Sequence, residues 1–253
     1  MEPAATGRVL SADGTPIAWQ RQGEGPPLVV VDPIMMDRTT SAMAGVAELL
    51  AAGHTVYTYD RRGKGESGDG EEYTPESEVD DLLAVVETAG GTADLLGTSS
   101  GAVLALRAAS ESAVISSVIA VEPPLGGADD PDIRPELEEL VSAGDRAGAI
   151  RLFQESIGVP EEMIEASEPS PFEPVAHTIS YDLTLLLETD VQSLAGIRVP
   201  VLVLASSGSD DRLREWARET AELLPEGSFQ LLEGSWHGLD DAALAAAVDA
   251  FLE

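Results

Sequence analysis

The feature that most restricts the fold of this chain is the pentapeptide Gly97-Thr98-Ser99-Ser100-Gly101, taken together with the segments on either side of it. Residues 93–96 are apolar enough to end a buried strand, and residues 102–109 form an apolar stretch without Gly or Pro, which predicts a buried helix. A serine flanked by two glycines at a strand-to-helix turn is typical of a nucleophile elbow. A Gly/Ser-rich loop that arose by chance is the alternative, but it gives no reason for the flanking strand and helix.

Apolar strand-like runs alternate with helix-like segments along most of the chain. Runs 28–31, 55–59, 93–96, 114–121, 200–204 and 228–232 predict strands, and segments 42–52, 78–88, 102–109, 212–224 and 242–252 predict helices. A β-hairpin is predicted at the N-terminus, where residues 8–11 and 16–22 flank Asp13-Gly14. The alternation predicts an α/β fold with a mainly parallel central sheet and helices on both faces.

The strand pattern disappears between residues 125 and 197. Short polar helices are predicted there at residues 135–143, 146–157, 161–166 and 178–188. We interpret this segment, 125–197, as a small helical cap inserted into a core formed by residues 1–124 and 198–253.

The chain of 253 residues carries a formal net charge of −32, which bears on its partners. Such a surface repels nucleic acid and anionic membranes, so we expect neither as a partner. A cationic substrate is one interpretation of the charge, and a solvated acidic surface that favours solubility is the one we prefer. No run approaches the ~18 apolar residues of a membrane span, and no secretory signal is visible, so we expect a cytoplasmic location. The absence of cysteine excludes disulfides and a cysteine nucleophile.

A serine nucleophile needs a base, and that base needs an acceptor that fixes its tautomer. In a parallel sheet the site lies at the carboxyl ends of the strands, and of the three histidines only His237 follows a predicted strand there. Two acids are candidates to orient His237. Asp210 follows strand 200–204, and Glu122 follows strand 114–121; we prefer Asp210, whose alternative role is to cap the helix that begins near Arg212.

These features resemble the α/β-hydrolase superfamily over nearly the whole chain, and within it small bacterial hydrolases of high-GC type with a short helical cap. The stretches that carry the resemblance are residues 59–67 (YDRRGKGES), 97–101 (GTSSG), 200–204 (PVLVL) and 232–237 (LEGSWH). The resemblance implies that Ser99 is the nucleophile, that His237 is the base and that no cofactor is required. It also implies that the cap shapes the substrate pocket.

The chain departs from the family pattern at two places that bear on catalysis. Family members usually carry His-Gly after the strand that corresponds to residues 28–31, whereas this chain has Asp32-Pro33, which places one oxyanion-hole N–H at Ile34; the other is that of Ser100. A carboxylate beside the hole opposes an oxyanion unless it is turned away or hydrogen-bonded. The family's acidic residue also aligns nearer Ser209 than Asp210.

Several residues near these positions are candidates for contacts with a small-molecule substrate. They are Asp32, Met35, Trp236, His177, Tyr181 and Asp182, and for the last four a packing role is an equally good interpretation. No metal site is expected, because the three histidines lack any ligand-like spacing.

We consider three functions. The first is a serine hydrolase that cleaves an ester, lactone or related small acyl substrate through a Ser-His-Asp/Glu triad. The second is a non-hydrolytic enzyme of the same fold, such as a lyase, a cyclase or a C–C bond-cleaving enzyme of a biosynthetic pathway, which Asp32 suggests. The third is a small-molecule-binding protein that has lost catalysis, although retention of both Ser99 and His237 argues against it.

Overall fold

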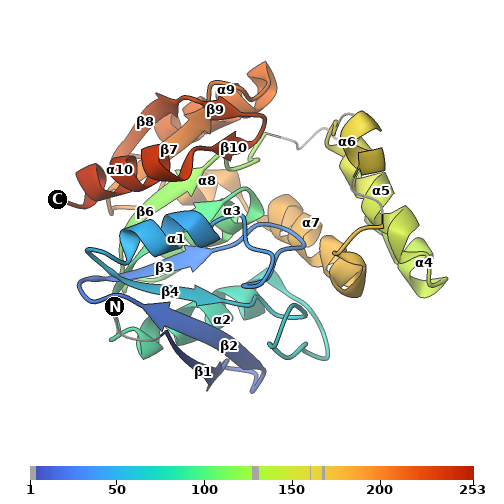
Figure 1. The fold of residues 1–253 in the computed structure, drawn as a ribbon, viewed down its shortest axis with the longest axis horizontal. Coiled ribbons are helices and arrows are strands. Elements are labelled where there is room, and N and C mark those ends of the chain that lie inside the picture. Colours follow the sequence, from blue (N-terminus) through green and yellow to red (C-terminus); the bar gives the residue numbers. More distant parts are fainter. Residues whose placement is uncertain (1–3, 127–130, 160, 167–168) are drawn as a thin grey trace.

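An eight-stranded sheet forms the centre of the molecule, in the order β1-β2-β4-β3-β5-β6-β7-β8 (Figure 1). The computed structural model describes residues 4–126, 131–159, 161–166 and 169–253. The strands are β1 (Ala5–Leu10), β2 (Pro16–Gln22), β3 (Pro27–Val31), β4 (Thr55–Tyr59), β5 (Ala93–Thr98), β6 (Ile115–Val121), β7 (Val201–Ser206) and β8 (Gly227–Leu232). The β1–β2 and β2–β4 pairs are antiparallel and all the others are parallel, which confirms the predicted sheet.

Helices cover both faces of the sheet. One face packs against α1 (Ala44–Leu50) and α10 (Asp241–Leu252). The other packs against α2 (Pro75–Thr88), α3 (Ser100–Glu111), α8 (Val191–Leu194) and α9 (Asp211–Leu223). The packing of strand β3 explains its continuously apolar sequence. Leu28 and Val30 pack on the face covered by α1 and α10, and Val29 and Val31 pack on the opposite face. Because side chains alternate along a strand, a strand that is covered on both faces has no polar side.

The residues between β6 and β7 form a helical layer beside the carboxyl end of the sheet. It contains α4 (Arg134–Ser142), α5 (Arg146–Ser156), α6 (Glu161–Ala166), the 3₁₀ helix η1 (Glu173–Thr178) and α7 (Ile179–Glu188). In Figure 1, α4, α5 and α6 stand away from the sheet, whereas α7 lies near α3, with which it shares contacts. The predicted cap, 125–197, also contains residues 127–130, 160 and 167–168, which lie outside the described residues.

Helix α7 packs on both the cap and the core. Its Ile179 is fully buried in an apolar cluster of cap side chains, while Leu185 is fully buried in the main core. Leu194 and Ile197, which also lie in the predicted cap range, pack with the main core as well. The cap is therefore attached to the core along one face of α7 as well as through loops.

Two very short strands, β9 (Gly234–Ser235) and β10 (Gly238–Leu239), form a hairpin after β8. Trp236 and His237 lie at its turn. Across the described parts of the chain, no helix has the length and apolar character required to span a membrane.

Candidate active site

Ser99 lies at the sharp turn between β5 and α3. Its backbone has φ 53° and ψ −125°, and its hydroxyl does not cap the helix. A Cβ atom at Gly97 would come closer than 3.0 Å to backbone atoms of Gly101 and Ala102, and one at Gly101 would come equally close to the carbonyl oxygen of Val31. Both glycines are therefore required for close approach, as expected for an elbow. The Ser99 side chain remains partly exposed at the carboxyl end of the sheet.

Backbone strain is concentrated at the predicted site. Among the described residues, the non-glycine residues with positive φ are Met35 (64°), Ser99 (53°), Glu122 (45°) and His237 (50°). Each of these conformations costs on the order of 1 kcal/mol or more, and such residues cluster at functional sites because the surrounding structure must hold them in place. All four lie in segments that follow the carboxyl ends of strands.

Glu122 and His237 are joined by a short hydrogen bond. The Nδ1 atom of His237 lies 2.6 Å from Oε2 of Glu122, whose side chain is 1% exposed. The other carboxylate oxygen, Oε1, accepts a hydrogen bond of 2.8 Å from the backbone N–H of Ser206. Burial raises the pKa of Glu122, but the hydrogen bonds from His237, Ser206 and Ser209 outweigh it and lower that pKa. An ionised Glu122 can only accept a hydrogen bond, so the pairing favours the tautomer with the proton on Nδ1 and leaves Nε2 as the acceptor of the imidazole.

Ser99 is placed next to Glu122 by the register of the sheet, and among the described residues no hydrogen bond joins Ser99 to His237. Thr98 of β5 and Val121 of β6 are Cα partners, so Ser99 and Glu122 leave neighbouring strands at the same level. The Ser99 N–H donates a hydrogen bond of 2.9 Å to the Val121 carbonyl, and the Glu122 N–H donates one of the same length to Leu204.

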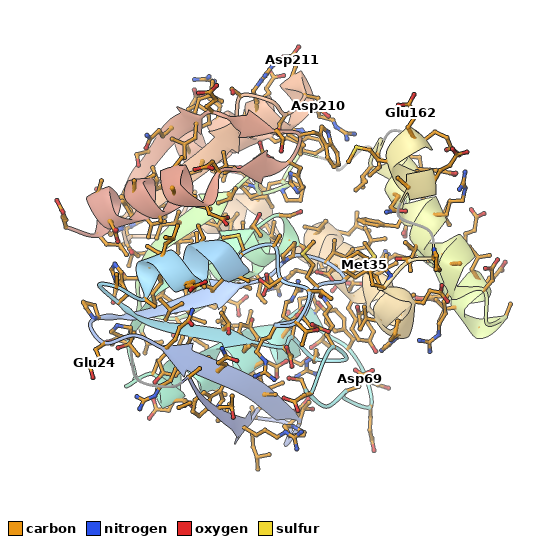
Figure 2. All side chains as sticks on the ribbon, viewed as in Figure 1. Glu24, Met35, Asp69, Glu162, Asp210 and Asp211 are labelled. Atoms are coloured by element: carbon orange, nitrogen blue, oxygen red, sulfur yellow. The ribbon has the colours of Figure 1, made fainter. Side chains whose placement is uncertain are left out.

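Asp210, the acid preferred from the sequence, has no hydrogen bond or ion pair with His237 among the described residues. Its carboxylate caps α9 by accepting a hydrogen bond of 2.9 Å from the Leu213 N–H, and Figure 2 shows it at the start of that helix. In this structure Glu122, the other candidate, bonds to His237, and the contacts of Asp210 are those of a helix cap. Ser209, at the position nearest the family's acid, is buried and accepts a hydrogen bond of 2.9 Å from the His237 N–H.

The loop after β3 lies between the elbow and the cap. Ile34 is half-buried, and Met35 is 7% exposed because it packs into the apolar cluster of the cap. Figure 2 shows Met35 on the side of the core that faces the cap. Met35 was predicted to contact substrate, and in this structure cap side chains cover most of it. Ser100, whose N–H is the other predicted oxyanion donor, is the first residue of α3 and is 2% exposed.

Asp32 is buried at the start of the same loop. Its Oδ1 accepts a hydrogen bond of 2.5 Å from the Ser41 hydroxyl, while Oδ2 is buried without a hydrogen-bond partner among the described residues. Burial raises the pKa of Asp32 to about 6, against the opposing effects of Ser41, Lys64 and Arg61. The Asp32 carboxyl is thus hydrogen-bonded on one side only.

His177 and Tyr181 connect the cap to the loop that follows β4. The Nε2 atom of His177 lies 3.2 Å from Oδ2 of Asp69, and the Tyr181 hydroxyl lies 3.2 Å from the same oxygen. Tyr181 also stacks on Tyr73, with ring centroids 4.4 Å apart. Both residues line a cavity of about 200 Å³ in the cap. Trp236 lies beside His237, with ring centroids 5.6 Å apart.

Sequence reasoning missed a cluster of buried charges that contacts Ser100 of the elbow. Arg61 and Lys64 from the loop after β4 reach Asp182 of α7, and each of the three side chains is at most 1% exposed. The available signal was weak: Lys64 is the only lysine of the chain and lies in the stretch 59–67, but a charged loop is ordinarily solvated.

The mainly parallel sheet and the strand-to-helix turn at Ser99 are typical of α/β hydrolases, and a family model matches the chain accordingly. Residues 34–250 match the model of the alpha/beta hydrolase family. The chain belongs to this family.

Solved structures with the same fold include hydrolases of several bacteria. An alpha/beta hydrolase from Sphaerobacter thermophilus is 35% identical, with a TM-score of 0.91 over 98% of this chain and 100% of that one. A hydrolase from Pseudomonas aeruginosa is 20% identical, with a TM-score of 0.82 over 98% of both chains. A thermophilic esterase from Thermogutta terrifontis is 21% identical, with a TM-score of 0.78 over 98% of both chains. No curated protein matches this sequence.

Proposed function

We propose that this protein is a serine hydrolase that cleaves an ester, a lactone or a related small acyl substrate. The observation that carries the proposal is the hydrogen bond of 2.6 Å between Glu122 and His237, together with a serine held at positive φ directly after β5, the strand that pairs with β6. A carboxylate, an imidazole and a serine in this arrangement are the parts of a triad, whatever their order in the chain. Membership of the alpha/beta hydrolase family supports the same chemistry.

In the proposed reaction the Ser99 hydroxyl attacks the acyl carbon and its proton passes to Nε2 of His237. The backbone N–H groups of Ser100 and Ile34 stabilise the oxyanion of the tetrahedral intermediate. Collapse of the intermediate expels the alcohol, which takes the proton from His237 and leaves an acyl group on Ser99. Water then attacks the acyl-enzyme with His237 as base, which releases the acid and restores Ser99. Glu122 stays ionised and holds the imidazolium.

A screen of esters of graded acyl length tests this proposal. We expect wild-type protein to turn over at least one of them, and Ser99→Ala to lower kcat/KM by about 10³-fold or more, because the attacking atom is lost. Ser110→Ala is the matched control: Ser110 lies on α3, the helix that follows Ser99, and its hydroxyl bonds only to the Arg107 carbonyl among the described residues, so we expect wild-type rates. Equal rates for Ser99→Ala and wild type would contradict the proposal.

A second candidate is a non-hydrolytic reaction of the same nucleophile, as in a lyase, a cyclase or a C–C bond-cleaving enzyme. It is favoured by the buried Asp32 carboxyl, which carries an oxygen without a hydrogen-bond partner among the described residues, at the start of the oxyanion loop. An additional acid or base at this position can move a proton that hydrolysis does not require. Reaction of Ser99 with an irreversible serine reagent, combined with no turnover of simple esters, would favour this candidate.

A further inference from the structure

Asp182 connects cap helix α7 to the core by three hydrogen bonds, one from Ser100 of the elbow and two from the loop after β4. From α7 its Oδ1 accepts hydrogen bonds from the Ser100 hydroxyl (2.7 Å) and from Arg61 Nη1 (2.6 Å). Its Oδ2 accepts one of 2.9 Å from Lys64 Nζ. The Asp182 side chain is fully buried, so these contacts exclude water. Ser100 follows Ser99 directly, and 82 residues separate it from Asp182.

The contacts form a buried cluster in which charges are matched. Arg61 also donates a hydrogen bond of 2.6 Å from Nε to Glu78, which in turn accepts one of 2.7 Å from the Tyr73 hydroxyl. Two cations thus face two carboxylates. Burial raises the pKa of Asp182, but Arg61 and Lys64 outweigh it and lower that pKa, so the carboxylate is ionised. A buried charge that is paired in this way holds its partners in one geometry, because any displacement leaves a charge uncompensated.

Arg61 also contacts the loop that contains the other proposed oxyanion donor. Its Nη1 lies 3.2 Å from the Ser100 hydroxyl and 3.3 Å from the backbone carbonyl of Asp32, which begins the loop that contains Ile34. The cluster therefore touches the residue that carries one proposed donor and the loop that carries the other.

We propose that Asp182 is a positioning residue, through which cap helix α7 fixes Ser100 and, by way of Arg61, the distance between the two oxyanion donors. The inference rests on the proposed function, since it assigns Asp182 a purpose at that same site. Substrate selection by the cap and stabilisation of the oxyanion then depend on one another, because a shift of α7 moves both.

Steady-state kinetics of Asp182→Asn measure the catalytic part of this proposal. Removing a donor from an oxyanion hole lowers the rate by about 10²–10³-fold, and displacing one lowers it less, so we expect kcat to fall about 10- to 100-fold. KM should change less than about 3-fold, because the lost contact matters mainly in the transition state.

Asp81→Asn is the matched control. Asp81 is also fully buried and ion-paired, with hydrogen bonds of 2.7 and 2.8 Å from Arg62. Among the described residues this pair has no hydrogen bond to α7 or to Ser100. We expect Asp81→Asn to lower the midpoint of unfolding but to leave kcat unchanged. If Asp182→Asn does not fold, Ser100→Ala replaces it, because that variant removes the hydroxyl, keeps the N–H and leaves the ion pairs intact.

Amide hydrogen exchange supplies a readout that does not require activity. We expect Asp182→Asn, or Ser100→Ala in its place, to accelerate exchange in peptides that cover residues 97–108, and Asp81→Asn to leave them unchanged. The proposal is overturned if exchange there matches the Asp81→Asn control, or if kcat is unaffected in an active enzyme. If wild-type protein cleaves no ester and Ser99 proves unreactive, the proposed function fails, and the exchange comparison alone decides whether Asp182 positions the elbow.

Discussion

At the residue scale, the order of residues in the chain leaves open which carboxylate is the partner of His237. Asp210 and Glu122 both follow a strand at the carboxyl edge of the sheet, and either can in principle reach an imidazole from there. The path of the two loops decides which carboxylate contacts His237. Asp210 turns into the first turn of α9 as its cap, and Ser209 fills the space beside the His237 backbone. Glu122, held at φ 45°, is the carboxylate that reaches Nδ1.

Asp32 gives a prediction about the dependence of stability on pH. Its pKa in the folded protein is raised to about 6 from the ordinary value of 3.8, mainly by burial, while Ser41, Lys64 and Arg61 lower it and Asp60 raises it further. The folded state therefore holds this proton more tightly than the unfolded state. The resulting stability is complete below the unfolded pKa and is lost as the pH rises through about 6.

Asp32→Asn removes this titration and keeps an oxygen that can accept from Ser41. Since one pKa unit corresponds to about 1.4 kcal/mol, wild type should lose on the order of 1 kcal/mol more unfolding free energy than the variant between about pH 5 and pH 8. Urea unfolding of both proteins at the two pH values measures the difference. A gap between the two proteins that does not change with pH would show that Asp32 ionises normally.

At the scale of elements, much of the fold could be predicted because most strands and helices have a hydrophobic pattern that is visible in their own residues. The four apolar residues 28–31 belong alternately to two cores, which is why they read as a strand covered on both faces. The predicted elbow strand and helix, 93–96 and 102–109, correspond to β5 (Ala93–Thr98) and α3 (Ser100–Glu111). The two-residue strands β9 and β10 and the short α8 could not be predicted, since two to four residues carry no periodicity.

The elbow also gives a prediction at this scale. We expect Gly101→Ala to prevent normal folding or to abolish activity, because the new Cβ would come closer than 3.0 Å to the backbone carbonyl oxygens of Val31 and Asp32, which cannot move without breaking the sheet. Gly53→Ala is the control: a Cβ there meets no atom within 4 Å, and the residue does not have positive φ. Circular dichroism and thermal unfolding compare the two. Equal stability of both variants would show that α3 does not pack as closely as described.

At the scale of the whole molecule, the site is assembled from segments that local patterns cannot bring together. Glu122 and His237 lie 115 residues apart, and topology alone places both at the same edge of the sheet. That edge was predictable from the β/α alternation, whereas the pairing of Asp182 with Arg61 and Lys64 was not. A helix carrying an aspartate and a loop carrying cations both look solvated in sequence, and only the packing of α7 against α3 shows that they are buried.

The same burial removes charges of both signs from the surface. Arg61, Arg62 and Lys64 are each at most 2% exposed, so three of the 14 basic side chains are withdrawn from solvent. Each of them faces at least one buried carboxylate. These three cations therefore form buried ion pairs in the core, and most of the carboxylates of the chain lie outside the set of buried residues.

The central claim is that Ser99 is activated by His237 and Glu122, and covalent labelling by a fluorophosphonate, read by intact mass and peptide mapping, tests it most directly. We expect one adduct per chain, on Ser99, with Glu122→Gln labelled about 10³–10⁴-fold more slowly and Asp210→Asn labelled at the wild-type rate. A folded wild-type protein that takes no label, or slow labelling of Asp210→Asn beside normal labelling of Glu122→Gln, would contradict the account.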